Sequence, residues 1–203
     1  MDLFLEKIIN SIMQIILFSF IPLIWWLITA RKDITFSQWV GLKPVSDGKK
    51  SKLAIWTIGI SVAFVLISVI ILYLIRNVET ATSVFRGLGM KAIPAIIVYA
   101  VFNTSLPEEI LFRGFLLKRL SNRFGFTMGN IIQSILFGLL HGVMFFSLVG
   151  TVQTILIILF TGGIAWCMGV INEKKANGSI IPSWCIHAIS NVFSGICSAF
   201  MLF

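Results

Sequence analysis

The sequence predicts an all-α protein, a polytopic bundle of about six membrane-spanning helices. Of its 203 residues, 58% are hydrophobic and only 12% are charged, and the mean hydropathy is +0.99. Soluble domains carry about a quarter charged residues, so this composition indicates a lipid environment. The length suits a single membrane domain over residues 1–203, with no appended soluble domain.

Six apolar stretches are long enough to cross a bilayer, since a spanning helix needs roughly 20 apolar residues. We predict spans over residues 8–30, 53–75, 93–117, 128–147, 151–171 and 181–203. The first stretch does not resemble a cleaved signal peptide, because acidic Asp2 and Glu6 precede it and it is too long. We expect it to remain as the first membrane helix.

The net charge of +8 comes from basic residues in the loops between these stretches. Eleven lie in the loops 31–52, 118–127 and 172–180: Arg31, Lys32, Lys43, Lys49, Lys50, Lys52, Lys118, Arg119, Arg123, Lys174 and Lys175. The opposite side receives four: Lys7, Arg76, Arg86 and Lys91. The positive-inside rule then puts the basic side in the cytoplasm and both termini outside. Anionic lipid, and not nucleic acid, is the expected partner of this charge.

The three cysteines, Cys167, Cys185 and Cys197, all fall inside apolar stretches, and no CxxC pattern occurs. Free cysteine behaves as a small apolar residue in such surroundings. We expect all three to be buried packing residues.

Ionisable residues occur within three of the predicted spans. Glu108, Glu109 and Arg113 lie in the third, His141 in the fourth and His187 in the sixth. A charge at mid-membrane costs about 2.5–3.5 kcal/mol on insertion scales. Residues of this kind usually face a polar interior and have a function there.

Helical spacing sorts these residues into faces. Glu109 and Arg113 are four residues apart and are expected to pair, whereas Glu108 points about 100° away from that pair. The same spacing relates Phe137 to His141, and His187 to Asn191. We therefore expect a carboxylate, two imidazoles and a carboxamide to face a common cavity.

Each of these features also has a structural interpretation. Ser105 to Glu108 matches a capping box with Pro107 in the first turn, in which Glu108 caps a helix that begins inside the membrane. Such a beginning is tolerated beside protein or a water-filled cavity. Single membrane histidines and asparagines often serve as interhelical hydrogen-bonding groups. Gly138 and Gly142 form a GxxxG pattern, which predicts close packing of the fourth span on a neighbour.

Three motifs taken together identify a family. Residues 108–113 read EExxxR, residues 137–141 read FxxxH and residues 187–191 read HxxxN. In this order the motifs resemble the CPBP family of intramembrane glutamic endopeptidases, also called the CAAX protease and bacteriocin-processing or Abi family. The resemblance covers about residues 100–195 and suggests a catalytic core over about 93–203. The chain looks like a short bacterial member, placed in the plasma membrane.

The resemblance implies hydrolysis of peptide bonds in membrane proteins or peptides, without a covalent intermediate, cofactor or metal. Glu108 would be the general base that deprotonates water, and His141 would help to hold that water. His187 and Asn191 would stabilise the oxyanion. By the same resemblance, three residues keep the site in shape: Glu109, Arg113 and Phe137.

Three other functions compete with this one. A zinc protease would use Glu108, His141 and His187 as a His₂Glu set, although HExxH is absent. A non-enzymatic immunity or scaffold protein would keep the motifs as structure. A proton-coupled transporter would use Glu and His as a relay, but the sequence lacks an internal inverted repeat. Peptide cleavage that disappears with Glu108 would separate the enzyme from the last two.

The charge distribution makes a prediction about topology. Single cysteines introduced at Lys49 and Lys174, in a background without the native cysteines, should resist a membrane-impermeant thiol reagent added to intact cells, because both loops are expected in the cytoplasm. Ready labelling of both positions would reverse the orientation.

Overall fold

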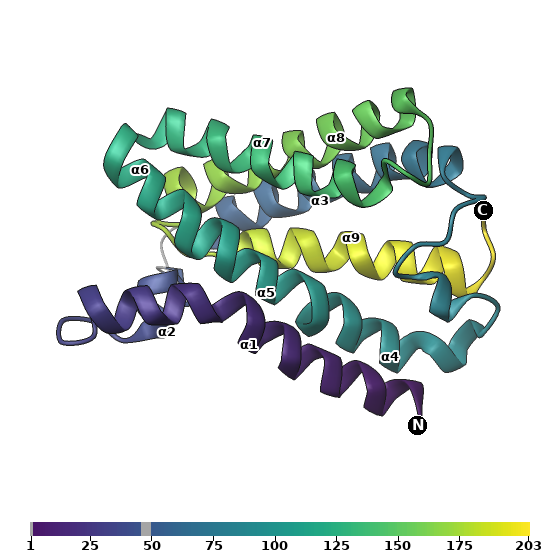
Figure 1. The fold of residues 1–203 in the computed structure, drawn as a ribbon, viewed down its shortest axis with the longest axis horizontal. Coiled ribbons are helices and arrows are strands. Elements are labelled where there is room, and N and C mark those ends of the chain that lie inside the picture. Colours follow the sequence, from purple (N-terminus) through teal and green to yellow (C-terminus); the bar gives the residue numbers. More distant parts are fainter. Residues whose placement is uncertain (1, 46–49) are drawn as a thin grey trace.

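The computed structural model describes residues 2–45 and 50–203, and every regular element within them is helical (Figure 1). The all-α prediction is therefore confirmed. The long helices run roughly side by side along the longest axis of the molecule. Those formed by a single α-helical stretch are α1 (Leu3–Thr29), α3 (Lys50–Leu74), α7 (Phe126–Phe145) and α9 (Ile181–Ala199). The helix α8 (Thr151–Val170) continues into a π-helix, η6 (Ile171–Lys175). A short helix, α2 (Phe36–Val40), joins the first two.

The third predicted span is one continuous helix over Gly89–Phe124, which begins with a 3₁₀ turn, η3 (Gly89–Ala92), and contains two π-helical segments. Its parts are α4 (Ile93–Val98), the π-helix η4 (Tyr99–Ser105), α5 (Leu106–Glu109), the π-helix η5 (Ile110–Leu117) and α6 (Lys118–Phe124). A proline inside a helix removes one backbone hydrogen bond, and wider π turns accommodate such a defect. Pro107 lies between the two π segments. The glutamates of the EExxxR motif thus sit at the most irregular point of this helix.

The capping-box interpretation of residues 105–108 is wrong. Ser105 has helical backbone angles (φ −65°, ψ −50°) and its side chain caps nothing. The helix does not begin at this point, because the turns of η4 continue into α5 without a break. Glu108 is therefore free of the backbone role that the pattern suggested.

Five helices of the described chain are long and apolar enough to cross a membrane: Leu3–Thr29, Ser51–Leu74, Gly89–Phe124, Phe126–Phe145 and Thr151–Lys175. The sixth predicted span, 181–203, corresponds to α9, which is too polar to meet the same criterion. Its polar residues are accommodated because α9 runs among the other helices and contacts α3, α4 and η4 (Figure 1). The structure is that of a multi-pass membrane protein.

The three basic loops meet at one end of the bundle, and both termini lie at the other (Figure 1). The backbone N–H of Ile180 donates to Gly41 O at 2.9 Å. Lys118 Nζ donates to Gly178 O at 2.8 Å, and Ser179 Oγ donates to Lys43 O at 2.7 Å. These bonds place the loops on one side, as predicted. That this side is cytoplasmic stays a prediction, and Lys49 lies outside the described residues.

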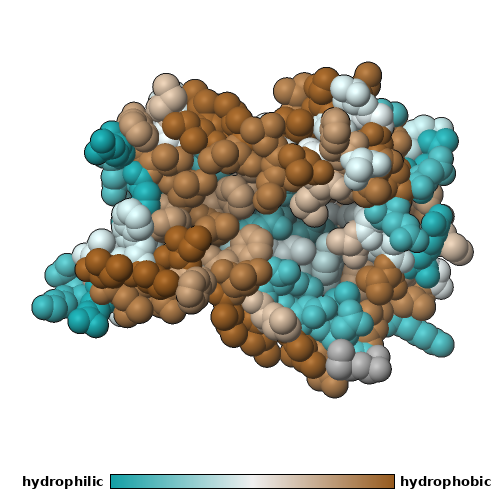
Figure 2. Space-filling view, in the orientation of Figure 1, coloured by the Kyte–Doolittle hydropathy of each residue, from teal (hydrophilic) through white to brown (hydrophobic). Residues whose placement is uncertain are grey.

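The surface is divided as a bilayer requires. Figure 2 shows hydrophobic residues over most of the molecule and hydrophilic residues at its two ends, with a further hydrophilic area near the middle of this face. On α1, for example, Ile16 and Leu17 are 64% and 66% exposed. Large apolar side chains at this exposure are stable when the surrounding solvent is lipid.

The cysteine prediction holds for only part of the set. Cys197 is buried, Cys167 is partly buried and Cys185 is exposed, and all three are free thiols. The prediction for Cys185 is wrong because an apolar residue on a membrane helix can face lipid as readily as it faces the protein core.

The GxxxG pattern produces the expected close contact. A methyl group added to Gly138 would lie 2.6 Å from Ile158 O and 3.3 Å from the backbone of Gly162, on α8. Glycine is therefore required for α7 and α8 to approach this closely, and the contact fixes the helix that carries His141.

This contact predicts a stability effect. Gly138→Ala should lower the midpoint of thermal unfolding in detergent, because overpacking of this kind costs about 1–3 kcal/mol. Gly163→Ala is the matched control, since an added methyl meets no atom within 4 Å there. The control should be neutral or slightly stabilising, because alanine favours helix. Equal midpoints for the two variants would contradict the packing argument.

Candidate active site

Phe137, from the FxxxH motif, lies at the centre of the candidate site. Its ring centroid is 4.4 Å from that of His141 and 6.0 Å from that of His187. The guanidinium of Arg113 lies over the same ring at 4.2 Å. Phe137 is only 2% exposed. The ring thus provides a fixed apolar surface against which polar groups from three helices are placed.

Glu109 connects two of these groups. The side chains of Glu109 and Arg113 are both fully buried, and Arg113 Nη1 lies 3.2 Å from Glu109 Oε1. The same oxygen is 3.1 Å from His187 Nδ1. An ionised carboxylate only accepts hydrogen bonds, so Nδ1 is the donor. The expected Glu109–Arg113 pair is present, and it also determines which nitrogen of His187 remains available.

Two residues that the sequence analysis missed support Glu109. Ser183 Oγ donates to Glu109 Oε2 and accepts a bond of 2.7 Å from Asn172 Nδ2. Ser183 and Asn172 have no exposed surface. Ser183 could have been identified from its spacing, because it stands four residues before His187 and shares its face of α9. Asn172 gave no such signal.

Glu108 approaches His187 from the other side. Its Oε2 lies 3.8 Å from His187 Nε2, and its side chain is 18% exposed. Within the described residues this oxygen is buried and has no hydrogen-bond partner. The sequence predicted that Glu108 would point away from Arg113, and among the described residues the two side chains form no ion pair. The two adjacent glutamates therefore face opposite nitrogens of one imidazole, which the sequence analysis did not foresee.

The histidines and Asn191 line a cavity of about 130 Å³, together with residues of α3 and α8. His141 Nδ1 donates to Phe137 O at 2.9 Å, so its Nε2 carries the lone pair when the ring is neutral. In the described part of the chain Glu108 is not among the residues that line the cavity. It lies next to His187, which does line it. The expected common cavity thus contains three of the four groups directly.

The amide of Asn191 is held by hydroxyl groups of the π-helix η4. Its Nδ2 donates to Thr104 Oγ1 at 2.8 Å and to Ser105 Oγ at 3.2 Å. Thr104 Oγ1 donates in turn to Tyr99 O at 3.2 Å. Thr104 and Ser105 were also missed as site residues, because small hydroxyl residues in a membrane helix usually bond to their own backbone.

A zinc site of Glu108, His141 and His187 is the metal-dependent alternative. No three side chains among the His, Cys, Asp and Glu of residues 2–45 and 50–203 are grouped so that they could hold a metal ion. The His₂Glu alternative therefore draws no support from the geometry.

Fold and site together define a polytopic membrane protein with a buried carboxylate–imidazole centre at the junction of three helices. The family described as Type II CAAX prenyl endopeptidase Rce1-like matches residues 89–193, or 105 of the 203 residues. The chain belongs to this family and is thus a membrane-embedded protease, which confirms the resemblance found in the motifs. No curated protein and no solved structure matches the chain.

The Glu109–Arg113 pair makes a testable prediction. Glu109→Gln should reduce the yield of folded protein, because it leaves Arg113 charged, fully buried and without a counter-charge, at a typical cost of about 3–5 kcal/mol. Adding Arg113→Gln should partly restore the yield. The measurement is the monodisperse fraction in detergent gel filtration.

Glu108→Gln serves as the matched control, since Glu108 pairs with no arginine among the described residues. It should accumulate normally. Loss of folded protein in this variant, with Glu109→Gln folded, would show that the two roles are inverted.

Proposed function

We propose that this protein is a glutamic-type intramembrane endopeptidase, in which Glu108 activates a water molecule that attacks the peptide bond. The observation that carries the proposal is the buried, unpartnered Oε2 of Glu108, 3.8 Å from His187 Nε2. A buried polar atom without a partner is costly. A carboxylate oxygen in this condition is suited to accept a hydrogen bond from water.

Glu108 acts as the general base in this mechanism. It takes a proton from water while the water oxygen bonds to the carbonyl carbon of the substrate. His141 holds the water through Nε2, because its Nδ1 is already committed to Phe137 O. General-base catalysis of this kind contributes about 10²–10⁴-fold. When the tetrahedral intermediate collapses, the C–N bond breaks and Glu108 returns the proton to the leaving amine.

His187 and Asn191 stabilise the oxyanion of the tetrahedral intermediate. In its imidazolium form, which donates from both nitrogens, His187 can donate from Nε2 to the oxyanion while Nδ1 remains bound to Glu109. Asn191 Nδ2 bonds to Thr104 at 2.8 Å and to Ser105 at 3.2 Å. In this proposal the N–H of the longer bond, to Ser105, turns to the oxyanion. One preorganised donor of this type is worth about 10²–10³-fold in rate.

Glu109, Ser183 and Asn172 are positioning residues in this proposal. They form one buried chain of hydrogen bonds that ends on His187 Nδ1. Because a histidine that donates from one nitrogen presents the other in a fixed direction, the chain orients Nε2 towards Glu108. Arg113 balances the charge of Glu109, and Phe137 limits the movement of both imidazoles.

The family description supports a proposal for the substrate class. We propose that the substrate is a membrane protein or lipid-anchored peptide, with prenylated CAAX peptides as the first class to test. The apolar helices place the protein in a membrane, and we propose the plasma membrane of a bacterium as its location.

The proposal predicts the effect of a conservative change at Glu108. Glu108→Gln keeps the size of the side chain but removes the basic oxygen, so cleavage should fall by about 100-fold or more. The measurement is cleavage of a quenched peptide, prenylated and unprenylated, by protein reconstituted in vesicles. Glu79→Gln, in an exposed loop, should keep full activity. Cleavage that survives Glu108→Gln would overturn the proposed base, and a wild-type protein that binds without cleaving would favour a scaffold.

A second prediction separates the glutamic mechanism from the zinc alternative. Purified protein should keep its activity after exhaustive chelation, because water activation by Glu108 needs no Lewis acid. Loss of activity on chelation, with recovery when zinc is added, would favour the His₂Glu set of Glu108, His141 and His187.

A further inference from the structure

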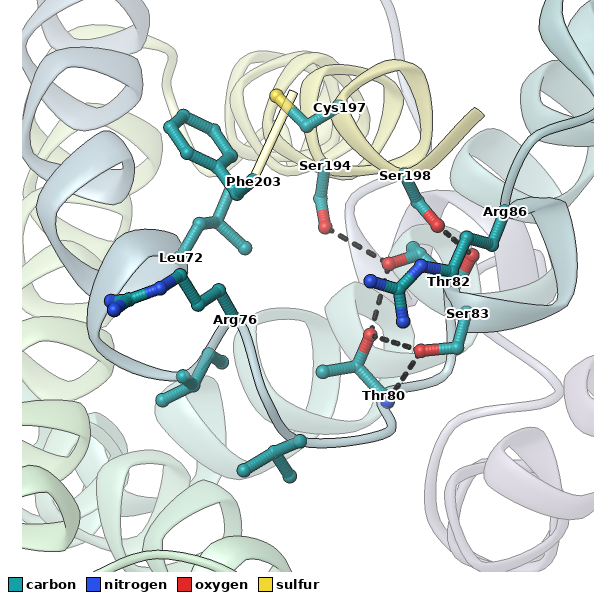
Figure 3. Close-up of a pocket in the computed structure, with 12 residues that line it drawn as sticks. Leu72, Arg76, Thr80, Thr82, Ser83, Arg86, Ser194, Cys197, Ser198 and Phe203 are labelled. Carbon is teal, nitrogen blue, oxygen red and sulfur yellow. Dashed lines mark hydrogen bonds between the residues drawn. The ribbon is translucent and has the colours of Figure 1, made fainter. Parts of the chain in front are cut away.

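A second polar pocket, drawn in Figure 3, lies at the end of the bundle that carries both termini (Figure 1). It is formed by the last turn of α3, the segment after it and the last turns of α9, and it has a volume of about 60 Å³. It shares no lining residue with the catalytic cavity. On α9 that cavity ends at Asn191, and this pocket begins at Ser194.

Hydroxyl groups form one wall of the pocket. Thr80 Oγ1 bonds to Thr82 Oγ1 at 3.0 Å and lies 3.5 Å from Ser83 Oγ. Thr82 Oγ1 bonds to Ser194 Oγ at 3.3 Å. Each hydroxyl carries one proton, so four hydroxyls joined by these three bonds keep one proton for an outside acceptor. Ser198 contributes none, because it donates to Thr82 O at 2.8 Å.

The two arginines of the pocket differ in their orientation (Figure 3). The guanidinium of Arg76 turns away from the hydroxyls, lies 4.1 Å from the centre of the Tyr73 ring and donates to Tyr73 O at 2.9 Å. The side chain of Arg86 extends across the hydroxyl wall. Among the described residues, Arg86 forms no ion pair with a carboxylate. Its guanidinium donors therefore remain available to a ligand.

These groups match one class of ligand. A planar guanidinium beside a hydroxyl donor is the arrangement that binds a phosphate group, because charge-assisted bonds from arginine are strong and geometrically selective. At about 15 Å³ for each water, the pocket holds roughly four waters. That room suits one tetrahedral oxyanion and is too small for a peptide or a sugar.

We propose that this pocket binds a phosphate group through Arg86 and the hydroxyls of Thr80, Thr82 and Ser194. The group has two possible sources, a phospholipid headgroup or free inorganic phosphate. The pocket lies at the end of the bundle that carries both termini, where hydrophilic residues gather on the surface (Figures 1 and 2), and we infer that it faces the headgroups of one leaflet. The site is separate from the catalytic groups and does not depend on the proposed reaction.

The test measures the midpoint of thermal unfolding of the whole protein in a phosphate-free sugar detergent. Phosphatidylglycerol, a galactolipid with the same acyl chains and inorganic phosphate are each titrated at constant ionic strength. A ligand that binds the native state raises the midpoint, and the rise grows as the ligand concentration exceeds its Kd. Stabilisation by phosphatidylglycerol and not by the galactolipid assigns the site to the headgroup, and stabilisation by inorganic phosphate assigns it to the free anion.

Two arginine variants locate the effect. Arg86→Gln should weaken the apparent affinity by about tenfold or more, because it removes the charge that faces the pocket. Arg76→Gln is the matched control, with the same loss of charge at the same rim, and should bind as the wild type does. Equal losses in both variants would mean non-specific attraction and would overturn the proposal. So would a wild-type protein stabilised equally by all three additions or by none.

Discussion

The buried pair of Glu109 and Arg113 is the constraint on which the rest of the site depends. Removing two charges from water costs several kcal/mol for each ion, and only good geometry and further hydrogen bonds offset this cost. Arg113 is incompletely satisfied within the described residues. Its contact with Glu109 at 3.2 Å lacks the alignment of a hydrogen bond, and its Nη2 bonds there only to Met168 Sδ, at 3.9 Å. Glu109, in contrast, has partners on both oxygens. The pair is thus better explained by its role in orienting the imidazole of His187 than by a contribution to stability alone.

A second constraint comes from the way the basic end of the bundle covers the helix that carries the glutamates. The short helix α2 lies against Gly114, where an added methyl group would approach Val40 O to 2.6 Å. The chain after α2 bonds to Ile180, at the start of α9. The same segment therefore contacts both the helix of Glu108 and the helix of His187. Its position sets the relative placement of the two halves of the site.

Much of this arrangement could be predicted from the sequence because its signals are local. Hydrophobic stretches located the spans, and fixed spacings identified the Glu109–Arg113 pair. The remainder depends on contacts between distant segments. The convergence of Glu108 and Glu109 on His187, and the support from Asn172 and Ser183, arise only when α9 meets the third span. Composition misled for Cys185, which is exposed. It also gave no sign that α9 would run among the other helices.

The two π-helical segments have a consequence for the orientation of side chains along the third span. A π turn contains more residues than an α turn, so each π segment shifts the angular phase of everything that follows it. An unbroken α-helix would keep one face towards the core from Ile93 to Phe124. Here the phase changes within η4, before Glu108, and again within η5, after Glu109. A single continuous helix can thus present apolar side chains to lipid near its ends and turn two carboxylates towards the core in its middle. It does so without the unsatisfied backbone groups that a broken helix would have.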